Sequence, residues 1–105
     1  MDSPIRIEIL NGCGVAGVAG RVRVYLRERG YDVLSTGNAK GHFEKTLIIE
    51  RKSSRNSNAR RLARTLKCDE QFVTRFLDSL SSVSVTLIVG DDYTNYLPDS
   101  LEAIQ

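Results

Sequence analysis

The sequence predicts an α+β domain, a two-layer α/β sandwich with both helices on one face of a mixed sheet. Stretches in which apolar and polar residues alternate, the pattern of half-buried strands, occur near the start, the middle and the end of the chain. Two stretches with the period of an amphipathic helix separate them. The resulting order is β-α-β-β-α-(β)-β, with one weak strand in brackets. Right-handed crossovers would make this arrangement ferredoxin-like or a close variant.

The length and composition of the chain allow one domain. Its 105 residues are 41% hydrophobic and 27% charged, values of an ordinary globular protein rather than a disordered one. We expect a single domain over residues 5–93, a disordered start or cloning remnant at 1–4, and a short tail at 94–105 with a helical turn near 97–104. No apolar run approaches the roughly 20 residues of a membrane span. We therefore expect membrane contact only through an anchor in a parent protein.

The first strand and the first helix follow from hydrophobic periodicity. Ile5, Ile7 and Ile9 alternate with polar residues, which predicts a strand over 5–10. The segment 11–14 interrupts this pattern, and a helical pattern follows, which Gly30 is placed to end. The apolar residues of the helix are Val15, Val18, Ala19, Val22 and Leu26, and the charged residues opposite them are Arg21, Arg23, Arg27 and Glu28.

Two further strands are expected in the middle of the chain. Residues 31–36 and 46–51 have the composition of strands, and the turn-rich segment 37–44 joins them. We expect these two strands to pair as a central hairpin that separates the two helices. The apolar run at 47–49 predicts that the later strand is buried on both faces.

The second helix and the last strand complete the pattern. Ser53 or Ser54 can cap the helix at its start. Residues 72–76 alternate weakly and predict a short strand, and 83–89 form the last strand, which ends at Gly90-Asp91-Asp92. The apolar stripe of the second helix is formed by Ala59, Leu62, Ala63 and Leu66.

A glycine-rich turn separates the first strand from the first helix. Gly12, Gly14 and Gly17 spell GxGxxG, the placement of a loop that cradles a pyrophosphate. Against that function, no acid ends the second strand, that strand leads into a hairpin, and the chain is too short for the usual two halves. We expect a structural turn in which Gly12 and Gly14 have positive φ and Asn11 binds the turn backbone. Gly17 with Gly20 would let the helix lie close to the sheet, and a ligand loop is the alternative.

No set of side chains in the sequence assembles an acid, a base and a nucleophile. His42 is the only histidine and stands in a turn. Asp91 and Asp92 follow a strand, where a turn with an Asx cap is a simpler interpretation than a metal-binding pair. Cys13 and Cys68 lack the spacing of a zinc site, so we expect two semi-buried thiols, with a single disulfide as the alternative. We predict a non-enzyme with no catalytic residue, no metal site and no cofactor.

The most informative functional signal is a basic segment without acids. The net charge of the chain is only +2, yet seven cations fall between residues 51 and 67. Such asymmetry attracts an anionic partner locally, although a solvated helix face, partly paired with acids downstream, is the alternative. Nucleic acid is not the expected partner, because an RNA-binding sheet needs exposed aromatic residues that the first and third strands lack. The seven cations are Arg51, Lys52, Arg55, Arg60, Arg61, Arg64 and Lys67.

From the glycine turn onward, the sequence resembles the LytR C-terminal domain family. Residues 7–17 have the strand, the Asn-Gly-x-Gly turn and the small-residue helix start of that family. The resemblance spans residues 5–93, although Cys13 stands where the family usually has a small residue such as Thr or Ser. Further similar segments follow in order at 30–33, 37–39, 46–49, 59–66 and 85–93, the last ending in Gly-x-Asp-Tyr.

The resemblance implies a cellular setting rather than a ligand. Domains of this family are appended to LytR-CpsA-Psr cell-envelope proteins, whose phosphotransferase chemistry lies in a different domain, and to other membrane-anchored proteins. We therefore expect an extracytoplasmic module of a larger membrane-anchored protein, in the periplasm or on the outer face of the cytoplasmic membrane. Its expected partner is an anionic cell-wall polymer or an envelope protein. The alternatives are a general protein-interaction or dimerisation domain and a nucleotide- or RNA-binding module that uses the Gly12–Gly17 loop or the basic helix. The oligomeric state stays open.

Overall fold

The computed structural model describes residues 4–68 and 72–97. Residues 1–3 of the expected disordered start lie outside these ranges, as does the helical turn expected near 97–104 apart from Leu97. Within the described ranges, neither α-helix is long and apolar enough to cross a membrane. The elements are β1 (Arg6–Asn11), α1 (Val18–Arg27), β2 (Asp32–Asn38), β3 (Leu47–Glu50), α2 (Ser57–Leu66), β4 (Val73–Arg75), β5 (Val85–Val89) and the short 3₁₀ helix η2 (Asp91–Asn95).

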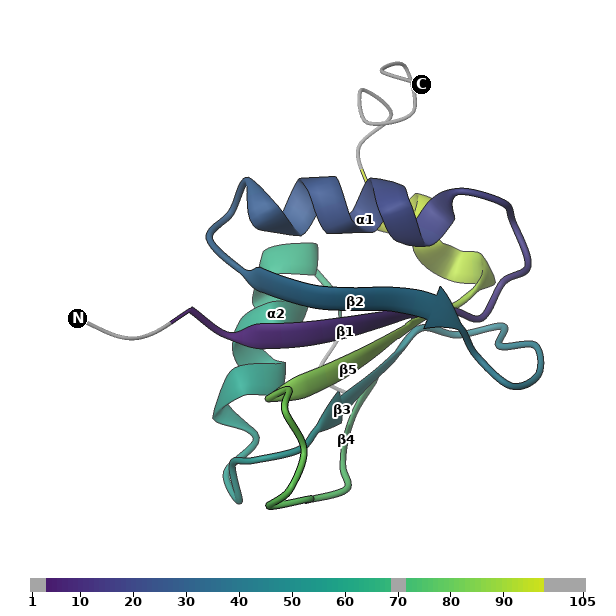
Figure 1. Cartoon of the computed structure of the whole chain (residues 1–105). Helices are drawn as coiled ribbons and strands as arrows, with labels where there is room; N and C mark the ends of the chain where they lie inside the picture. The colour runs from purple at the N-terminus through teal and green to yellow at the C-terminus, as the bar shows by residue number, and fades with distance from the viewer. Residues whose placement is uncertain (1–3, 69–71, 98–105) are drawn as a thin grey trace.

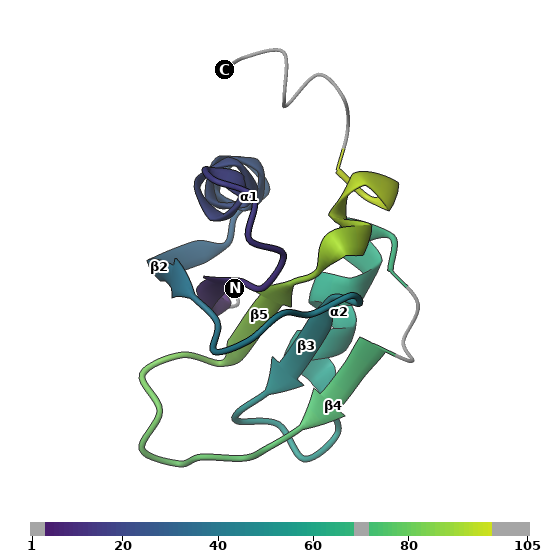
Figure 2. The same cartoon turned by 90° about the vertical axis from the view of Figure 1, so that its right-hand side faces the viewer.

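The five strands form one mixed sheet in the order β2-β1-β5-β3-β4 (Figure 1). β1 runs parallel to both of its neighbours, β2 and β5, whereas β5 and β3 are antiparallel and β3 and β4 are parallel again. Each parallel pair at an edge of the sheet is joined through a helix, which gives two β-α-β units with β5 between them. Both helices lie on the same side of the sheet (Figure 2). The predicted α+β sandwich is confirmed, as a five-stranded variant.

The predicted central hairpin is wrong. β2 is an edge strand that pairs only with β1, while β3 pairs with β5 and β4. Because α1 carries the chain back along the sheet, β2 enters the sheet parallel to β1. It lies on the side of β1 that faces away from β5. The long connection over 39–46 then crosses the end of the sheet instead of forming a tight turn (Figure 1).

One hydrophobic core fills the space between the sheet and the two helices. Ile7 and Ile9 of β1 are fully buried, as are Val22 of α1 and Leu62 of α2. Each such side chain contributes about 1.5–3 kcal/mol by leaving water. Every residue of β5 is buried, because this strand lies in the middle of the sheet. The burial on both faces that the sequence predicted for β3 therefore belongs to β5, since β3 alternates between half-buried and buried residues.

The starts of both helices differ from the predictions. α1 begins at Val18, after a turn in which Val15 is exposed, so Val15 does not belong to the apolar stripe. Ser53 lies four residues before the first residue of α2, and its hydroxyl oxygen accepts a hydrogen bond from the Ser57 N–H at 3.1 Å. Ser53 thus satisfies one of the free N–H groups at the start of α2 from outside the helix, and the carboxylate of Glu50 satisfies another, that of Ala59.

Candidate functional site

The glycine turn after β1 is closed by the side chain of Asn11, as the sequence predicted. Its Oδ1 atom accepts hydrogen bonds from the backbone N–H groups of Cys13 and Gly14, each at 3.1 Å, and its Nδ2 atom donates to the carbonyl oxygen of Val15 at 2.7 Å. These N–H groups are among those that a phosphate would need in a dinucleotide-binding loop. Because the protein's own amide already occupies them, the turn has the geometry of a structural element.

The glycines of this turn have different roles from those predicted. Gly14 and Gly17 have positive φ, 76° and 83°, but Gly12 does not. A side chain at Gly12 would collide with Ile88 and Phe43, both 2.9 Å from the position of its Cβ, so close packing requires this glycine. The predicted close approach at Gly17 and Gly20 is wrong, because no atom lies within 4 Å of a Cβ built at either position.

Glu50, which the sequence analysis did not single out, organises the start of α2. Its side chain is fully buried and accepts four hydrogen bonds. The Oε1 atom accepts from the Ala59 N–H at 2.9 Å. The Oε2 atom accepts from the N–H groups of Lys52 and Ser53 at 3.1 and 2.9 Å, and from Asn58 Nδ2 at 3.1 Å. Burial raises the pKa of this carboxyl, but the hydrogen bonds outweigh it and hold the pKa below the ordinary value of 4.5.

The cations of α2 point into water. Arg60, Arg61, Arg64 and Lys67 are all exposed, on the side of the helix opposite its buried apolar stripe. Lys52 and Arg55, in the turn before the helix, are exposed as well. Six of the seven cations singled out in the sequence are therefore accessible at the start of α2 and along it.

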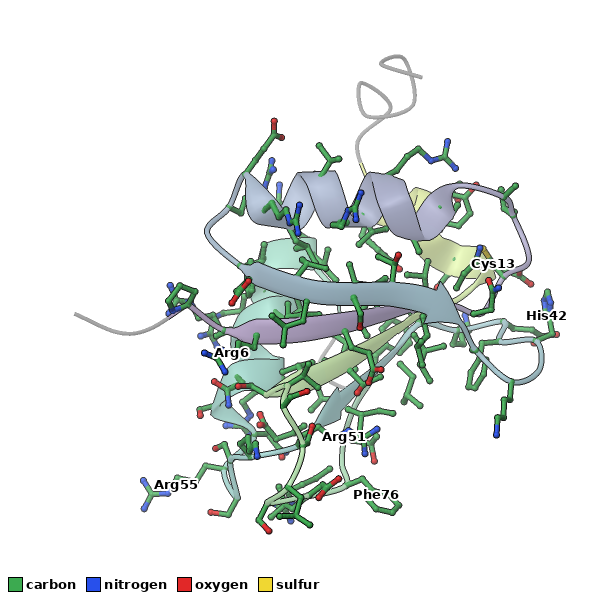
Figure 3. All side chains as sticks on the ribbon, in the orientation of Figure 1. Arg6, Cys13, His42, Arg51, Arg55 and Phe76 are labelled. Carbon is green, nitrogen blue, oxygen red and sulfur yellow. The ribbon has the colours of Figure 1, made fainter. Side chains whose placement is uncertain are left out.

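Arg51, the seventh cation, lies on the other face of the sheet. Strand alternation turns Ile48 and Glu50 toward the helices, so Arg51 extends over the opposite face (Figure 3). There its Nε atom donates to Thr86 Oγ1 at 3.1 Å, and the Thr86 hydroxyl donates to Glu8 Oε2 at 2.8 Å. The Arg51 guanidinium therefore does not belong to the surface formed by α2.

The helix layer carries more positive charge than the sequence analysis assigned to it. α1 contributes Arg21, Arg23 and Arg27, of which the last two are exposed. With the three arginines of α2, the two helices have six arginines and no acidic residue. The signal was present in the sequence as arginines opposite the apolar stripe of α1. What was missing was the fold, which places both helices on one side of the sheet (Figure 2).

The two aspartates after β5 have separate partners and do not form a pair. Asp92 Oδ1 accepts hydrogen bonds from the N–H and the hydroxyl of Thr46, at 2.9 and 2.7 Å, which ties the end of β5 to the start of β3. The same hydroxyl lies 2.6 Å from the Tyr96 Oη, and burial raises the pKa of that phenol. Asp91 Oδ2 lies 2.7 Å from His42 Nε2. Among the residues that the structure describes, no three His, Cys, Asp or Glu side chains gather as a metal site would require.

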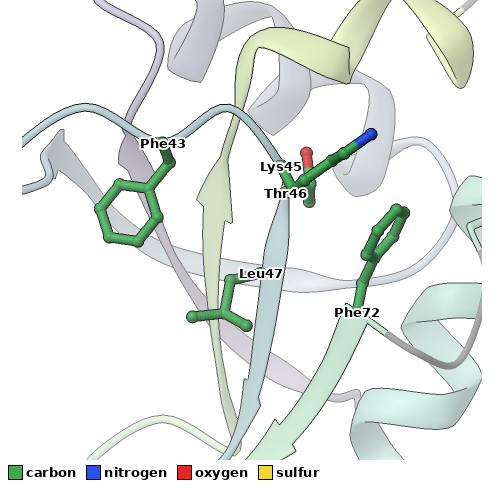
Figure 4. A pocket seen from close by; sticks show the side chains of 5 residues that line it. All are labelled: Phe43, Lys45, Thr46, Leu47 and Phe72. Atoms are coloured by element: carbon green, nitrogen blue, oxygen red, sulfur yellow. The ribbon is translucent and has the colours of Figure 1, made fainter.

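The larger of two described cavities lies beside β3, with a volume of about 440 Å³. Phe43 and Phe72 stand on either side of Leu47, and Lys45 lies above them (Figure 4). A smaller cavity of about 200 Å³ shares Lys45 and Phe72 with it. The smaller cavity is also lined by Lys67, Cys68, Asp92, Asn95 and Tyr96. The sequence pattern had indicated neither cavity.

Neither cysteine forms a disulfide. Cys13 is buried in the core next to the Asn11 amide, with its Sγ 3.3 Å from Asn11 Oδ1, and Cys68 is half-buried after α2. Of the two interpretations that the sequence left open, two separate thiols is the one that the structure has.

Comparisons with known proteins complete the description of the chain. The family model described as LytR cell envelope-related transcriptional attenuator matches residues 4–93. The comparison with curated proteins gives no match. Among solved structures, the chain is similar to the soluble domain of a conserved hypothetical secreted protein from Mycobacterium marinum, with a TM-score of 0.62 and 19% sequence identity. That likeness covers 97% of this chain and 70% of the other, and at this identity it shows a common fold.

Proposed function

Because the chain belongs to the LytR C-terminal domain family, we propose that it is a non-catalytic, extracytoplasmic module of the cell envelope that docks onto an anionic cell-wall polymer. The family description names the cell envelope, which supports the setting. The larger protein that carries the module would supply any chemistry and any anchor.

The basic helix layer is the observation that carries this proposal. Six arginines and no acid on the two helices give this side of the molecule a positive field, although the net charge of the chain is only +2. The acidic side chains of the described residues lie mainly elsewhere, on the open face of the sheet and in the turns, and Glu50 is buried under its hydrogen bonds. A polymer with regularly spaced phosphates or carboxylates can contact several of these arginines at once.

This mode of binding has a defined salt dependence. Exposed charges are screened over about 8 Å at physiological ionic strength, so contacts with a flexible polyanion weaken steeply as salt is added. A polyanion also releases condensed counterions on binding, and the slope of affinity against salt then reports the number of charges engaged. We expect the affinity to fall with salt and the fold to stay unchanged.

The test is co-sedimentation of the domain with intact peptidoglycan sacculi that retain their anionic polymers, over a series of salt concentrations. Charge reversal at Arg60, Arg61 and Arg64 should abolish pelleting while the circular dichroism spectrum stays that of the native protein, because these side chains are exposed. Unchanged pelleting of this triple variant would refute the helix layer as the binding surface. Competition by an RNA of similar charge would indicate electrostatic attraction without specificity.

A matched control keeps the net charge change constant. Charge reversal at Arg6, Lys40 and Lys45, which are exposed and lie outside the two helices, changes the total charge by the same amount. If overall charge governed binding, both triple variants would lose it equally. If the helix layer governs binding, only the first triple variant loses it.

A specific observation favours one alternative, a protein-interaction domain that uses the edge of the sheet. β2 pairs with β1 along one side only, and its last five residues, 34–38, are exposed and carry neither charge nor proline. Exposed edges of this kind pair with strands of other chains. This alternative would be supported if sedimentation velocity showed that the chain self-associates and that Thr36→Pro abolishes the self-association.

A further inference from the structure

The loop between β4 and β5 exposes apolar side chains that the fold does not use. Six large hydrophobic side chains are exposed among the described residues, and three of them fall within residues 76–80. Phe76 is 70% exposed, Leu77 48% and Leu80 93%. We call these three residues the apolar tip. Such a concentration of exposed apolar surface in one short segment marks an interaction site more often than a single exposed leucine does.

Hydrogen bonds order the turn that carries the apolar tip. The Leu80 N–H donates to the carboxylate of Asp78 at 3.0 Å, and the Ser81 N–H donates to the backbone carbonyl of Asp78, also at 3.0 Å. The first residues of the loop are tied to the end of β3, where the Phe76 N–H donates to the Glu50 carbonyl at 3.0 Å and the Asp78 N–H donates to the Arg51 carbonyl at 2.8 Å. These hydrogen bonds fix the backbone of the turn while its apolar side chains face solvent.

Cations surround the apolar tip. The Arg51 guanidinium lies 5.6 Å from the centre of the Phe76 ring and donates to the Phe76 carbonyl at 3.3 Å. Lys52 Nζ donates to the carbonyl of Ser79 at 2.9 Å. Arg55 projects at the same end of the molecule as Phe76 (Figure 3). Arg75, next to the tip, donates to the Ser54 carbonyl. Asp78, the acid that lies between the residues of the tip, accepts a hydrogen bond from the Leu80 N–H within the turn.

We propose that the apolar tip inserts into the surface of an anionic lipid bilayer, with Arg51, Lys52 and Arg55 contacting the headgroups. A bilayer surface provides both chemistries that this end of the molecule displays, a negatively charged headgroup layer and an apolar interior a few ångströms below it. The proposal departs from the expectation that only an anchor in the parent protein would contact the membrane.

The shape of the tip favours a bilayer over other occupants. Neither described cavity is lined by its residues, and at 93% exposure the Leu80 side chain projects from a convex turn rather than into a groove. A cell-wall polymer offers hydroxyl, amide and anionic groups, against which aliphatic leucines gain little. A protein partner would need a pocket that fits this tip, whereas lipid adapts its shape to any apolar projection.

A tryptophan probe tests the proposal directly, because the chain contains no tryptophan. Leu80→Trp should give a fluorescence emission that shifts to shorter wavelength on addition of phosphatidylglycerol vesicles, and that brominated lipids quench. Leu34→Trp, at a partly exposed position on β2, should show neither effect. Unchanged emission of Leu80→Trp at saturating anionic lipid would overturn the proposal. A shift that depends on protein concentration without vesicles would also overturn it, in favour of a second copy of the chain.

Vesicle sedimentation gives a second readout that is independent of the probe. The pair Phe76→Ser and Leu80→Ser should weaken binding to phosphatidylglycerol vesicles by about tenfold or more, because each side chain loses its transfer into the bilayer. Leu34→Ser is the control and should bind as the unmodified chain does. The tip variants should still pellet with sacculi, so failure of the membrane proposal and failure of the polymer proposal are distinguishable. Equal vesicle binding by the tip variants would overturn the membrane proposal.

Discussion

Replacing Glu50 by glutamine keeps the size of the side chain but removes the charge that holds the start of α2. The carboxylate is fully buried and accepts hydrogen bonds from two N–H groups of the turn after β3, from the Asn58 amide and from the Ala59 N–H in the first turn of the helix. We expect Glu50→Gln to lower the free energy of unfolding by about 3 kcal/mol at neutral pH.

The four hydrogen bonds set this magnitude. Oε2 accepts three of them, so the least costly orientation places the glutamine oxygen there and turns its NH₂ group toward the Ala59 N–H. That N–H then has no acceptor inside the protein, at a cost of about 1–3 kcal/mol. The other three bonds lose their charge assistance and become roughly half as strong. A neutral amide is cheaper to bury than a carboxylate, which offsets part of this loss.

The pH dependence gives the same prediction a second readout. The folded pKa of Glu50 lies below its ordinary value of 4.5, so the folded state keeps the charge at a pH where the unfolded chain takes up a proton. The stabilisation is complete above 4.5 and is lost as the pH falls toward the lowered pKa. Since Glu50→Gln has no such proton to bind, the stability difference between the two proteins should shrink as the pH is lowered from 7 to about 3.

Urea denaturation followed by circular dichroism at both pH values measures these differences. The exposed Glu44→Gln removes the same charge and should change the free energy of unfolding by less than about 0.5 kcal/mol. A Glu50→Gln protein within about 1 kcal/mol of the unmodified chain at pH 7 would refute the reasoning, because the buried N–H groups would then have found other acceptors. A stability difference that stays constant with pH would refute the assigned pKa.

Two further predictions concern the turns at the end of the sheet that carries the glycine loop. Gly90→Ala should lower the melting temperature in scanning calorimetry by more than about 10 °C. The new Cβ would lie 2.6 Å from the backbone nitrogen of Thr46 and 2.7 Å from the backbone oxygen of Lys45. A smaller decrease would mean that β3 moves easily away from β5. Asn11→Ala should cost about 1–2 kcal/mol in urea denaturation, since two N–H groups lose their acceptor, whereas Asn11→Asp keeps an acceptor oxygen and should cost less. Equal losses in the two Asn11 variants would show that these bonds do not hold the turn.

Local sequence patterns predicted where the helices and strands lie better than they predicted which strands pair in the sheet. Alternation around Ile7 and Ile9 identified β1 because one face of that strand packs under the helices, and a pattern of period two reports such one-sided burial. Nothing local distinguishes a strand that joins a hairpin from one that returns in parallel through a helix. The positions of β2 at an edge and β3 beside β5 therefore required the fold itself.

The sequence predicted the basic surface of α2 only in part, and the neighbouring residues Glu50 and Arg51 show why. Glu50 and Arg51 follow each other at the end of β3, and the sequence analysis grouped Arg51 with the helix by charge alone. Alternation along the strand sends the two side chains to opposite faces, so Glu50 caps α2 and Arg51 reaches Thr86 on the open face. Charge grouping by position in the sequence also missed the arginines of α1, which only the packing of both helices on one face joins to those of α2.

The central position of β5 has a consequence for how the chain folds. This strand is the last of the five to be synthesised, yet it lies between β1 and β3 and joins the two β-α-β units. Until residues 85–89 are inserted, the two units share no backbone ladder, and the facing edges of β1 and β3 both stay unpaired. Folding must therefore bring together segments almost 80 residues apart, with Ile7 opposite Val85, and such distant pairing raises the contact order and favours slow folding. Until β5 is in place, the unpaired edges of β1 and β3 can pair with strands of other chains.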